Sequence, residues 1–191
     1  MENKEFLILV DEKDQQWGKL EKELVHQLGL LHRAFSIFIF NSKGELLLQQ
    51  RADSKYHSGG LWTNTCCSHP RFGEDLSDAV NRRLIEEMGM KSKTEFAFSF
   101  VYKANFENGL TEHEFDHVFF GVTDDLPKPE KLEVKDWKYM NIKLLENDLE
   151  QNPHQYTAWL KICFNKVLRH LENKNLKIKK VKTLEYAQIH Y

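Results

Sequence analysis

Six residues have side chains that together could hold a metal ion and transfer protons. They are His26, His32, Cys67, His69, Glu112 and Glu114. Imidazole nitrogens combined with carboxylate oxygens suit a borderline divalent ion such as Mn²⁺, Zn²⁺ or Fe²⁺. On a strand, Glu112, Glu114 and Asp116 would point to one face, where their charges would repel unless something positive lies among them.

A solvated strand face with scattered histidines is the other interpretation, because the chain has nine histidines in 191 residues. Spacing alone leaves both interpretations open. The remaining histidines receive no predicted role: His57, His113, His117, His154, His170 and His190.

Length and composition predict a single domain over residues 1–191. The chain can bury a substantial core, and 41% hydrophobic with 29% charged residues is typical of soluble globular proteins. A net charge of −2 gives no case for nucleic-acid or membrane binding. No apolar run reaches the roughly 18 residues that span a bilayer. With no signal-peptide pattern and three cysteines that form no disulfide framework, we expect a cytoplasmic protein.

The elements that would position these residues follow from periodicity and turn residues. We expect a strand at 6–10, then a hairpin of strands 34–40 and 45–50 around a Gly44-containing turn. The segment 51–69 is long and irregular, as functional loops often are. An apolar stripe predicts a helix with Asp75 as N-cap and Gly89 as stop. The stripe comprises Leu76, Val80, Leu84 and Met88.

The second half of the chain predicts a further hairpin and two more helices. Strands at 95–104 and 112–122 should pair across 105–111, and a charged loop at 124–135 should lead into a last strand at 134–140. Helices are expected at 141–150 and 154–172, followed by a tail at 173–191 without a predicted role. Strands interleaved with helices and antiparallel hairpins predict an α/β (α+β) sandwich.

The central helix carries the first recognisable motif. Ser68-x5-Glu74-x7-Arg82-Arg83-Leu84-Ile85-Glu86-Glu87-Met88-Gly89-Met90 resembles the Nudix signature G-x5-E-x7-R-E-U-x-E-E-x-G-U, where U is a bulky aliphatic residue. Ser68 replaces the first glycine, and Arg83 replaces a glutamate that helps Nudix hydrolases gather Mg²⁺ over a diphosphate. This loss of a carboxylate argues against ordinary hydrolysis. Arg83 could instead bind a phosphate oxygen and leave Glu87 to hold one Mg²⁺.

A simpler interpretation of the same helix is surface ion pairing. Arg82 with Glu86, and Arg83 with Glu87, are i,i+4 pairs worth about 0.3–0.5 kcal/mol each.

A second motif narrows the resemblance. Leu61-Trp62-Thr63-Asn64-Thr65-Cys66-Cys67-Ser68-His69-Pro70 is similar to the W-T-N-x-x-C-x-H-P segment of type 1 isopentenyl-diphosphate delta-isomerases, which have the Nudix fold. Leu31-His32-Arg33-Ala34-Phe35-Ser36, the Arg51-to-Lys55 loop and Glu112-His113-Glu114 resemble that family's other motifs in the same order. The resemblance covers roughly residues 4–172 and implies a Nudix-like α/β/α sandwich with a mixed central sheet.

That family converts isopentenyl diphosphate to dimethylallyl diphosphate through a tertiary carbocation. One proton is added at C4, and another is removed from C2 on the opposite face. The resemblance implies Cys67 and Glu114 as the opposed proton-transfer residues. It also implies that Tyr102 hydrogen-bonds the catalytic carboxyl and that Trp159 faces the cation, an attraction of about 2 kcal/mol when desolvated.

The resemblance implies two metal sites and a diphosphate site as well. One ion, Mn²⁺ or Zn²⁺, would be held by His26, His32, His69, Glu112 and Glu114. Mg²⁺ would accompany the diphosphate at Glu87. The diphosphate contacts would be Lys22, Arg51, Lys55, Ser68 and Arg83. Isopentenyl diphosphate is then the expected partner of a monomer.

Each of these residues also has an ordinary explanation. Trp159 could be a core aromatic, Tyr102 a strand residue, Cys67 a small buried hydrophobe, and the lysines solvated charges.

Two other functions also compete with the isomerase. A Nudix hydrolase of nucleoside-diphosphate-linked compounds shares the helix, and a non-catalytic ligand-binding relative could keep the fold and metal. Ligand binding alone needs neither Cys67 nor the paired glutamates, so their presence argues against the non-catalytic relative.

Overall fold

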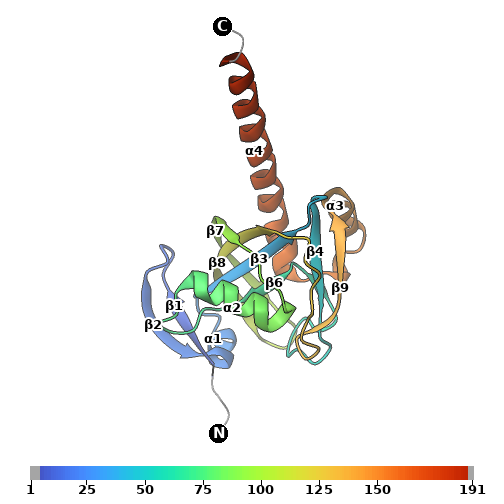
Figure 1. Ribbon diagram of the computed structural model, residues 1–191. Helices are drawn as coiled ribbons and strands as arrows, with labels where there is room; N and C mark the ends of the chain where they lie inside the picture. The colour runs from blue at the N-terminus through green and yellow to red at the C-terminus, as the bar shows by residue number, and fades with distance from the viewer. Residues whose placement is uncertain (1–4, 189–191) are drawn as a thin grey trace.

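The computed structural model describes residues 5–188, with side chains described for residues 5–173. Its described strands form one curled mixed β-sheet with helices on both faces (Figure 1). The strands are β1 (Phe6–Val10), β2 (Gln16–Glu21), β3 (His32–Phe40), β4 (Glu45–Arg51), β5 (Trp62–Thr63), β6 (Cys66–Ser68), β7 (Thr94–Asn105), β8 (Thr111–Val122) and β9 (Val134–Asn141). The helices are α1 (Lys22–Leu28), α2 (Leu76–Met88), α3 (Ile142–Gln151), the 3-10 helix η1 (Pro153–Gln155) and α4 (Ala158–Gln188). The predicted α/β sandwich with a mixed sheet is confirmed.

Strand β3 lies inside the sheet because both of its edges are paired. β8 runs parallel to it along one edge, beginning with the register pair His32↔Glu114. On the other edge β6 is antiparallel and sets Cys67 opposite Ser36. The sheet register therefore brings His32, Glu114 and Cys67 onto three neighbouring strands.

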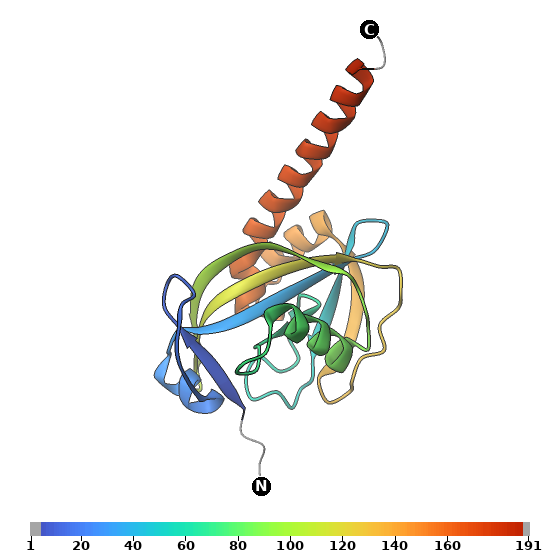
Figure 2. The same ribbon diagram turned by 60° about the vertical axis from the view of Figure 1, so that its left-hand side comes forward.

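Alternate residues of β3 face two separate hydrophobic cores, as side chains on a strand must. Ile37 packs in the core beneath α2 with Leu84, whereas Phe38 packs in the core beneath α4 with Leu160 and Phe164. Figure 2 shows α2 and α4 on opposite sides of the curved strands. Burying one such side chain contributes about 1.5–3 kcal/mol, so both helices are held firmly against the sheet.

The bounds of α2 agree with the prediction. The Ser77 amide donates a hydrogen bond of 2.9 Å to the Asp75 side chain at the N-cap. Gly89 ends the helix with φ of 61°, and a Cβ there would lie 2.2 Å from the carbonyl oxygen of Lys128. The backbone amide of Lys128 donates to the Met88 carbonyl, so the loop before β9 is tied to the end of α2.

The predicted hairpin of strands 34–40 and 45–50 is confirmed at its turn, and β3 and β4 are antiparallel neighbours in the sheet. The turn forms as expected, with Gly44 at φ of 76°, but β3 and β4 share only the register pair Phe40↔Leu46 among the described residues. Beyond the turn, β8 and β6 pair with the two edges of β3, so β3 and β4 diverge. β4 instead pairs with β9 from Glu45↔Asn141 to Arg51↔Val134.

Several other elements refine the prediction. β7 and β8 pair antiparallel as expected, with a bulge between Phe96 and Phe98. α4 begins at Ala158 rather than at 154, because η1 precedes it, and it continues past 172. The predicted tail at 173–191 lies almost entirely outside the residues whose side chains are described. β2, α1, β5 and β6 were not predicted, and α1 and β6 carry His26 and Cys67.

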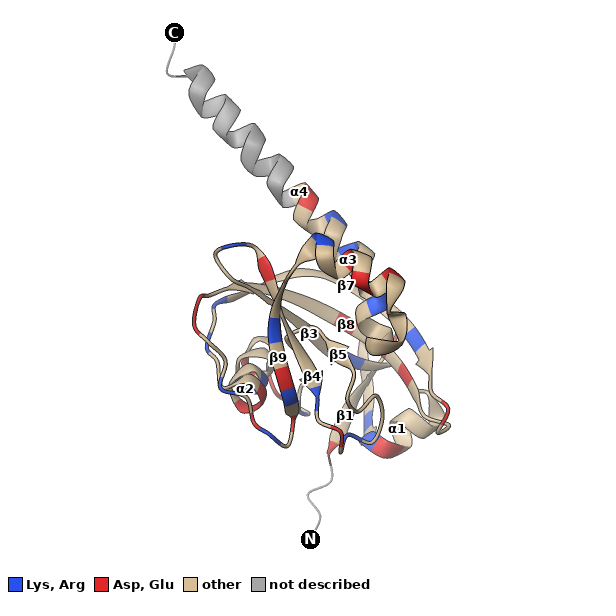
Figure 3. Ribbon diagram, turned by 90° about the vertical axis from the view of Figure 1, so that its right-hand side faces the viewer, with Lys and Arg blue, Asp and Glu red and all other residues tan. Residues whose placement is uncertain are grey.

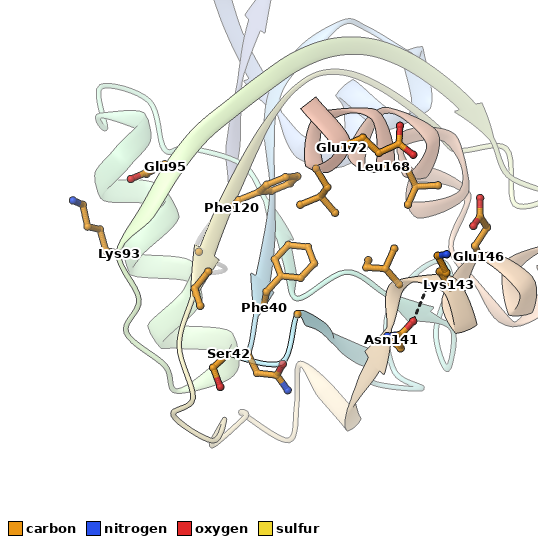
Figure 4. A pocket seen from close by; sticks show the side chains of 16 residues that line it. Phe40, Ser42, Lys93, Glu95, Phe120, Asn141, Lys143, Glu146, Leu168 and Glu172 are labelled. Carbon is orange, nitrogen blue, oxygen red and sulfur yellow. Dashed lines mark hydrogen bonds between the residues drawn. The ribbon is translucent and has the colours of Figure 1, made fainter. Parts of the chain in front are cut away.

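A broad cavity of about 910 Å³ lies between α3, α4 and the turn that joins β3 to β4 (Figure 4). Its floor is apolar, with Phe40, Phe120 and Leu168, and its rim carries Lys93 and Glu146. No residue of the predicted site is among its described lining residues.

Charges are mixed over the described surface. Figure 3 shows basic and acidic segments interspersed along the strands and helices of the face that it draws. Among the described helices, none combines the length and the apolar character needed to cross a bilayer.

Candidate active site and metal centre

Nearly all of the predicted site residues line one cavity, which we call the histidine–carboxylate cavity. They are Lys22, Arg51, Lys55, Cys67, Ser68, His69, Arg83, Glu87, Tyr102, Glu112, Glu114 and Trp159. Tyr56, His57 and Glu133 complete its described lining. The two remaining predicted residues, His26 and His32, are buried next to Glu112. The structure therefore brings the whole predicted set together.

The candidate metal centre draws one ligand from each of four segments. His26 comes from α1, His32 from β3, His69 follows β6, and Glu112 comes from β8. Their candidate ligand atoms all lie within 4.8 Å of one another. Glu114 lies beside this group, with Oε1 at 3.0 Å from His69 Nε2 and 3.7 Å from His32 Nε2.

The unsatisfied atoms of this cluster fit a bound cation. Nε2 of His26, Nε2 of His32, Nδ1 of His69 and Oε2 of Glu112 are buried without a hydrogen-bond partner among the described residues. A buried polar atom left in this way costs about 1–3 kcal/mol, so four together are unusual unless something binds them. In two of the imidazoles, the second ring nitrogen also has a polar partner that orients the ring. His32 Nδ1 lies 2.9 Å from the Leu30 carbonyl oxygen, and His26 Nδ1 lies 3.1 Å from the Tyr56 hydroxyl.

Glu114 is held from both neighbouring strands. The Tyr102 hydroxyl of β7 donates a hydrogen bond of 2.7 Å to Oε2, and the imidazoles of His32 and His69 face Oε1. Burial and the charge of Glu112 would raise the pKa of Glu114, but the neighbouring imidazoles of His32 and His69 keep it below its usual value. Burial and the Glu114 charge raise the pKa of Tyr102, so the phenol stays protonated and remains a donor.

Cys67 presents a protonated thiol to the same cavity. Burial, together with the charge of Asp116, raises the pKa of the thiol well above its ordinary value. Its Sγ donates to Asn64 Oδ1 at 3.0 Å and lies 3.5 Å from Ser36 Oγ. Ser36 in turn donates a hydrogen bond of 2.8 Å to Asp116 Oδ2. The thiol is thus held in one orientation by a buried polar network.

The aromatic and cationic parts of the cavity adjoin each other. Trp159 is 5% exposed, and the Arg51 guanidinium lies 5.1 Å from its ring centroid. Lys22 pairs with Glu5 at 2.9 Å, and Arg83 pairs with Glu87 at 2.6 Å. The buried Glu87 also accepts a hydrogen bond from Gln49, so its carboxylate is fixed within the cavity wall.

The other signature residues of α2 are structural in this arrangement. Arg82 holds Glu74 with two hydrogen bonds of 2.6 and 2.8 Å. This pair ties the loop before α2 to the helix. Of the two i,i+4 pairs that the sequence suggested, Arg82–Glu86 is therefore peripheral, whereas Arg83–Glu87 lies in the histidine–carboxylate cavity.

The sequence prediction missed three residues with close contacts to this site. His57 Nε2 lies 2.9 Å from Glu112 Oε1, although His57 received no predicted role. Its place in the long irregular loop was the available signal. Asp116 shares the strand face of Glu112 and Glu114, which the alternation had indicated. Glu133 contacts Lys55 and had no signal in the sequence.

The fold resembles that of solved structures with little sequence identity to this chain. The DR0079 protein of Deinococcus radiodurans matches with a TM-score of 0.72 at 18% identity, covering 85% of this chain and 98% of that one. The MutT protein of Methanosarcina mazei matches with a TM-score of 0.61 at 21% identity, over 75% and 96% of the two chains. The family model described as the NUDIX domain matches residues 30–160.

Curated relatives are more similar in sequence. Isopentenyl-diphosphate Delta-isomerase 2 of Aromatoleum aromaticum is 52% identical over 162 residues, which cover 85% of this chain and 86% of the relative. The isopentenyl-diphosphate Delta-isomerase of Pectobacterium atrosepticum is 48% identical over 161 residues, or 84% and 90% of the two chains. This chain therefore belongs to the isopentenyl-diphosphate Delta-isomerase family of NUDIX-domain proteins.

Proposed function

We propose that this protein isomerises isopentenyl diphosphate to dimethylallyl diphosphate. The observation that carries the proposal is that Cys67 and Glu114 line one cavity with Trp159 and a group of cations. The relatives that bear the name of this activity match over most of the chain, which supports the same substrate.

Cys67 and Glu114 supply the two proton transfers. One of them adds a proton to C4 of the alkene, and the other removes a proton from C2. Substrate and product carry the same number of protons. After each turnover, however, one of the two side chains has lost a proton and the other has gained one. Tyr102 holds the Glu114 carboxyl, and Ser36 with Asn64 holds the thiol, so both groups are positioned before the substrate arrives.

Trp159 stabilises the tertiary carbocation from its ring face. This contribution is about 2 kcal/mol in a desolvated site. Enzymes typically lower barriers by about 8–23 kcal/mol, so most of the effect must come from positioning and fixed charges. A buried pocket also keeps water away from the cation.

Metal ions would bind at two places. His26, His32, His69 and Glu112, with Glu114 beside them, would hold Mn²⁺ or Zn²⁺. When bound, this ion would orient the Glu114 carboxyl and tune its acidity. Glu87 would hold Mg²⁺ that arrives with the diphosphate.

The diphosphate serves as the handle of the substrate. Lys22, Arg51, Lys55 and Arg83 would bind its oxygens, with Ser68 nearby. Binding energy from this remote group can align the alkene between the thiol and the carboxyl.

We further propose that residues 1–191 act as one catalytic domain and as a monomer in the cytoplasm. All of the proposed site residues come from a single chain, so the site needs no second copy. The three cysteines of the described residues are free, as suits a reducing compartment.

Hydrolysis of nucleoside-diphosphate-linked compounds remains the competing function. Arg83 speaks against it, because its guanidinium stands where hydrolases of this superfamily place a metal-binding carboxylate. It also contacts Glu87 at 2.6 Å.

The test is to incubate the purified chain with isopentenyl diphosphate, Mg²⁺ and either Mn²⁺ or Zn²⁺ in heavy water. Deuterium in dimethylallyl diphosphate, detected by NMR, is the expected result. Unchanged substrate with the metals restored would contradict the proposal. Release of phosphate or pyrophosphate from nucleoside-diphosphate compounds would instead support the hydrolase.

A further inference from the structure

Glu133 lies between two of the cations that we assign to the diphosphate. Its Oε2 forms a short ion pair with Lys55 Nζ and lies 3.4 Å from Arg83 Nη2. It lines the histidine–carboxylate cavity and also a neighbouring cavity of about 690 Å³, which we call the outer cavity. Lys22, Lys55, Ser68, Arg83 and Glu133 line both, so Glu133 stands where the two cavities meet.

The backbone around Glu133 is tied to the loop that carries Lys55. The Ala52 amide donates to the Glu133 carbonyl at 3.0 Å, and the Glu133 amide donates to the Glu130 carbonyl at 3.0 Å. Val134, the next residue, pairs with Arg51 at the start of β9. The carboxylate is therefore delivered to the cations by ordered backbone, while its side chain is still about a quarter exposed, at 27%.

Glu133 carries a negative charge at neutral pH. Burial alone would raise its pKa, but the hydrogen bond and charge of Lys55, with the charge of Arg83, bring the pKa below its usual value. Lys55 is partly buried and needs an anionic partner when no substrate is present, whereas Arg83 already pairs with Glu87 at 2.6 Å and with Glu86 at 3.1 Å. Glu133 Oε2 is the anionic partner of Lys55 and also lies near Arg83, in the position where a phosphate oxygen would contact the same two side chains.

We propose that Glu133 is a resident counter-ion that gives up Lys55 and Arg83 to the diphosphate and pairs with them again when the product leaves. The proposal rests on the proposed function only in assigning Lys55 and Arg83 to the diphosphate. Substrate and product of an isomerase carry the same diphosphate, so very tight binding of that group would slow product release. A competing carboxylate weakens the binding of both equally, and its return to the two cations favours release.

The test compares Glu133→Gln with Glu130→Gln, using the full chain and inorganic pyrophosphate as the probe. Glu130 is a matched control because it lies in the same loop, is exposed and lines neither cavity among their described residues. Isothermal titration calorimetry without Mg²⁺ should give a pyrophosphate Kd about tenfold lower for Glu133→Gln and within twofold of wild type for Glu130→Gln. The KM for isopentenyl diphosphate should fall in parallel, with no gain in kcat.

A double-mutant cycle with Lys55→Gln makes the test specific. In the Lys55→Gln background, the gain from Glu133→Gln should shrink by at least half, because one of the released partners is gone. A Kd that is unchanged or higher in Glu133→Gln overturns the proposal. A loss of affinity that is seen only with Mg²⁺ would also overturn it, because Glu133 would then be a metal ligand. An equal gain of affinity in Glu130→Gln would overturn it as well, because long-range charge alone would then explain the effect.

Failure of the proposed function would look different. If the wild-type chain does not isomerise isopentenyl diphosphate, but Glu133→Gln binds pyrophosphate more tightly, the counter-ion proposal stands and the proposed function is wrong. If the chain is an active isomerase, but its affinity for pyrophosphate is the same with and without the Glu133 carboxylate, the proposed function stands and the counter-ion proposal is wrong.

Discussion

The broad cavity and the histidine–carboxylate cavity differ in what they bury. The broad cavity holds about 910 Å³ over an apolar floor, and the charged residues Glu146 and Glu172 at its rim are partly or fully exposed to solvent. The histidine–carboxylate cavity is lined by His69, Glu112 and Glu114, each less than a tenth exposed. Burying ionisable groups is expensive unless they are paired, and it shifts their pKa values. The contrast teaches that buried charge, rather than empty volume, marks the chemistry.

The clearest way to break this contrast is to remove a proton-transfer group. Glu114→Gln should lower kcat by about 10²- to 10⁴-fold, because the proton transfer that we propose for this carboxyl is lost while Tyr102 can still hydrogen-bond the amide. Cys67→Ala should lose a similar factor. Formation of dimethylallyl diphosphate measures both.

Cys163→Ala is the matched control, since Cys163 is a buried cysteine of α4 outside the histidine–carboxylate cavity. It should retain kcat even where the midpoint of thermal unfolding falls. Near-wild-type turnover in Glu114→Gln or Cys67→Ala would remove the assignment of the pair, provided that circular dichroism shows a folded protein.

The metal centre offers the next largest effect. His32→Ala removes a proposed ligand whose ring is fully buried, so bound Mn²⁺ or Zn²⁺ should fall at least tenfold by elemental analysis. His154→Ala, an exposed histidine of η1, should bind as much metal as wild type. Equal metal content in the two variants would exclude His32 as a ligand.

The stability of the metal-free protein at acid pH tests the effect of the buried carboxylates in the histidine–carboxylate cavity. Burial would raise the pKa of Glu112, but the neighbouring imidazoles of His26 and His57 bring it well below its usual value. A carboxylate with a depressed pKa in the folded state stabilises above its unfolded-state pKa of about 4.5, and this stability is lost as the pH falls through the folded value.

Glu112→Gln should therefore flatten the loss of stability below about pH 4.5, as measured by urea unfolding at several pH values. Glu107→Gln, which removes an exposed carboxylate, should keep the wild-type slope. An unchanged slope in Glu112→Gln would show that this carboxylate is not the group that titrates.

The smallest effect is expected in the broad cavity. Leu168→Ala removes an apolar side chain from its wall and should lower the free energy of unfolding by about 1–3 kcal/mol. The same variant should leave kcat/KM within twofold of wild type. A tenfold loss of kcat/KM in a folded Leu168→Ala protein would give the broad cavity a role in the reaction.

Local sequence was sufficient for the features that depend on near neighbours. The caps Asp75 and Gly89 and the apolar stripe determined α2, because helix bounds depend on residues within a few positions. The alternation of β8 determined that Glu112 and Glu114 share one face. Order and spacing of the motifs were also sufficient to indicate the family.

Tertiary structure alone decided which distant residues meet. The pairing of β3 with β8 and β6 limits the β3–β4 hairpin to the residues next to its turn, because a strand has only two edges. His57 reached Glu112, and Glu133 reached Lys55, through loops whose paths no local periodicity encodes. Contacts between residues tens of positions apart depend on how whole elements pack, so a sequence can name the participants of a site before it reveals their geometry.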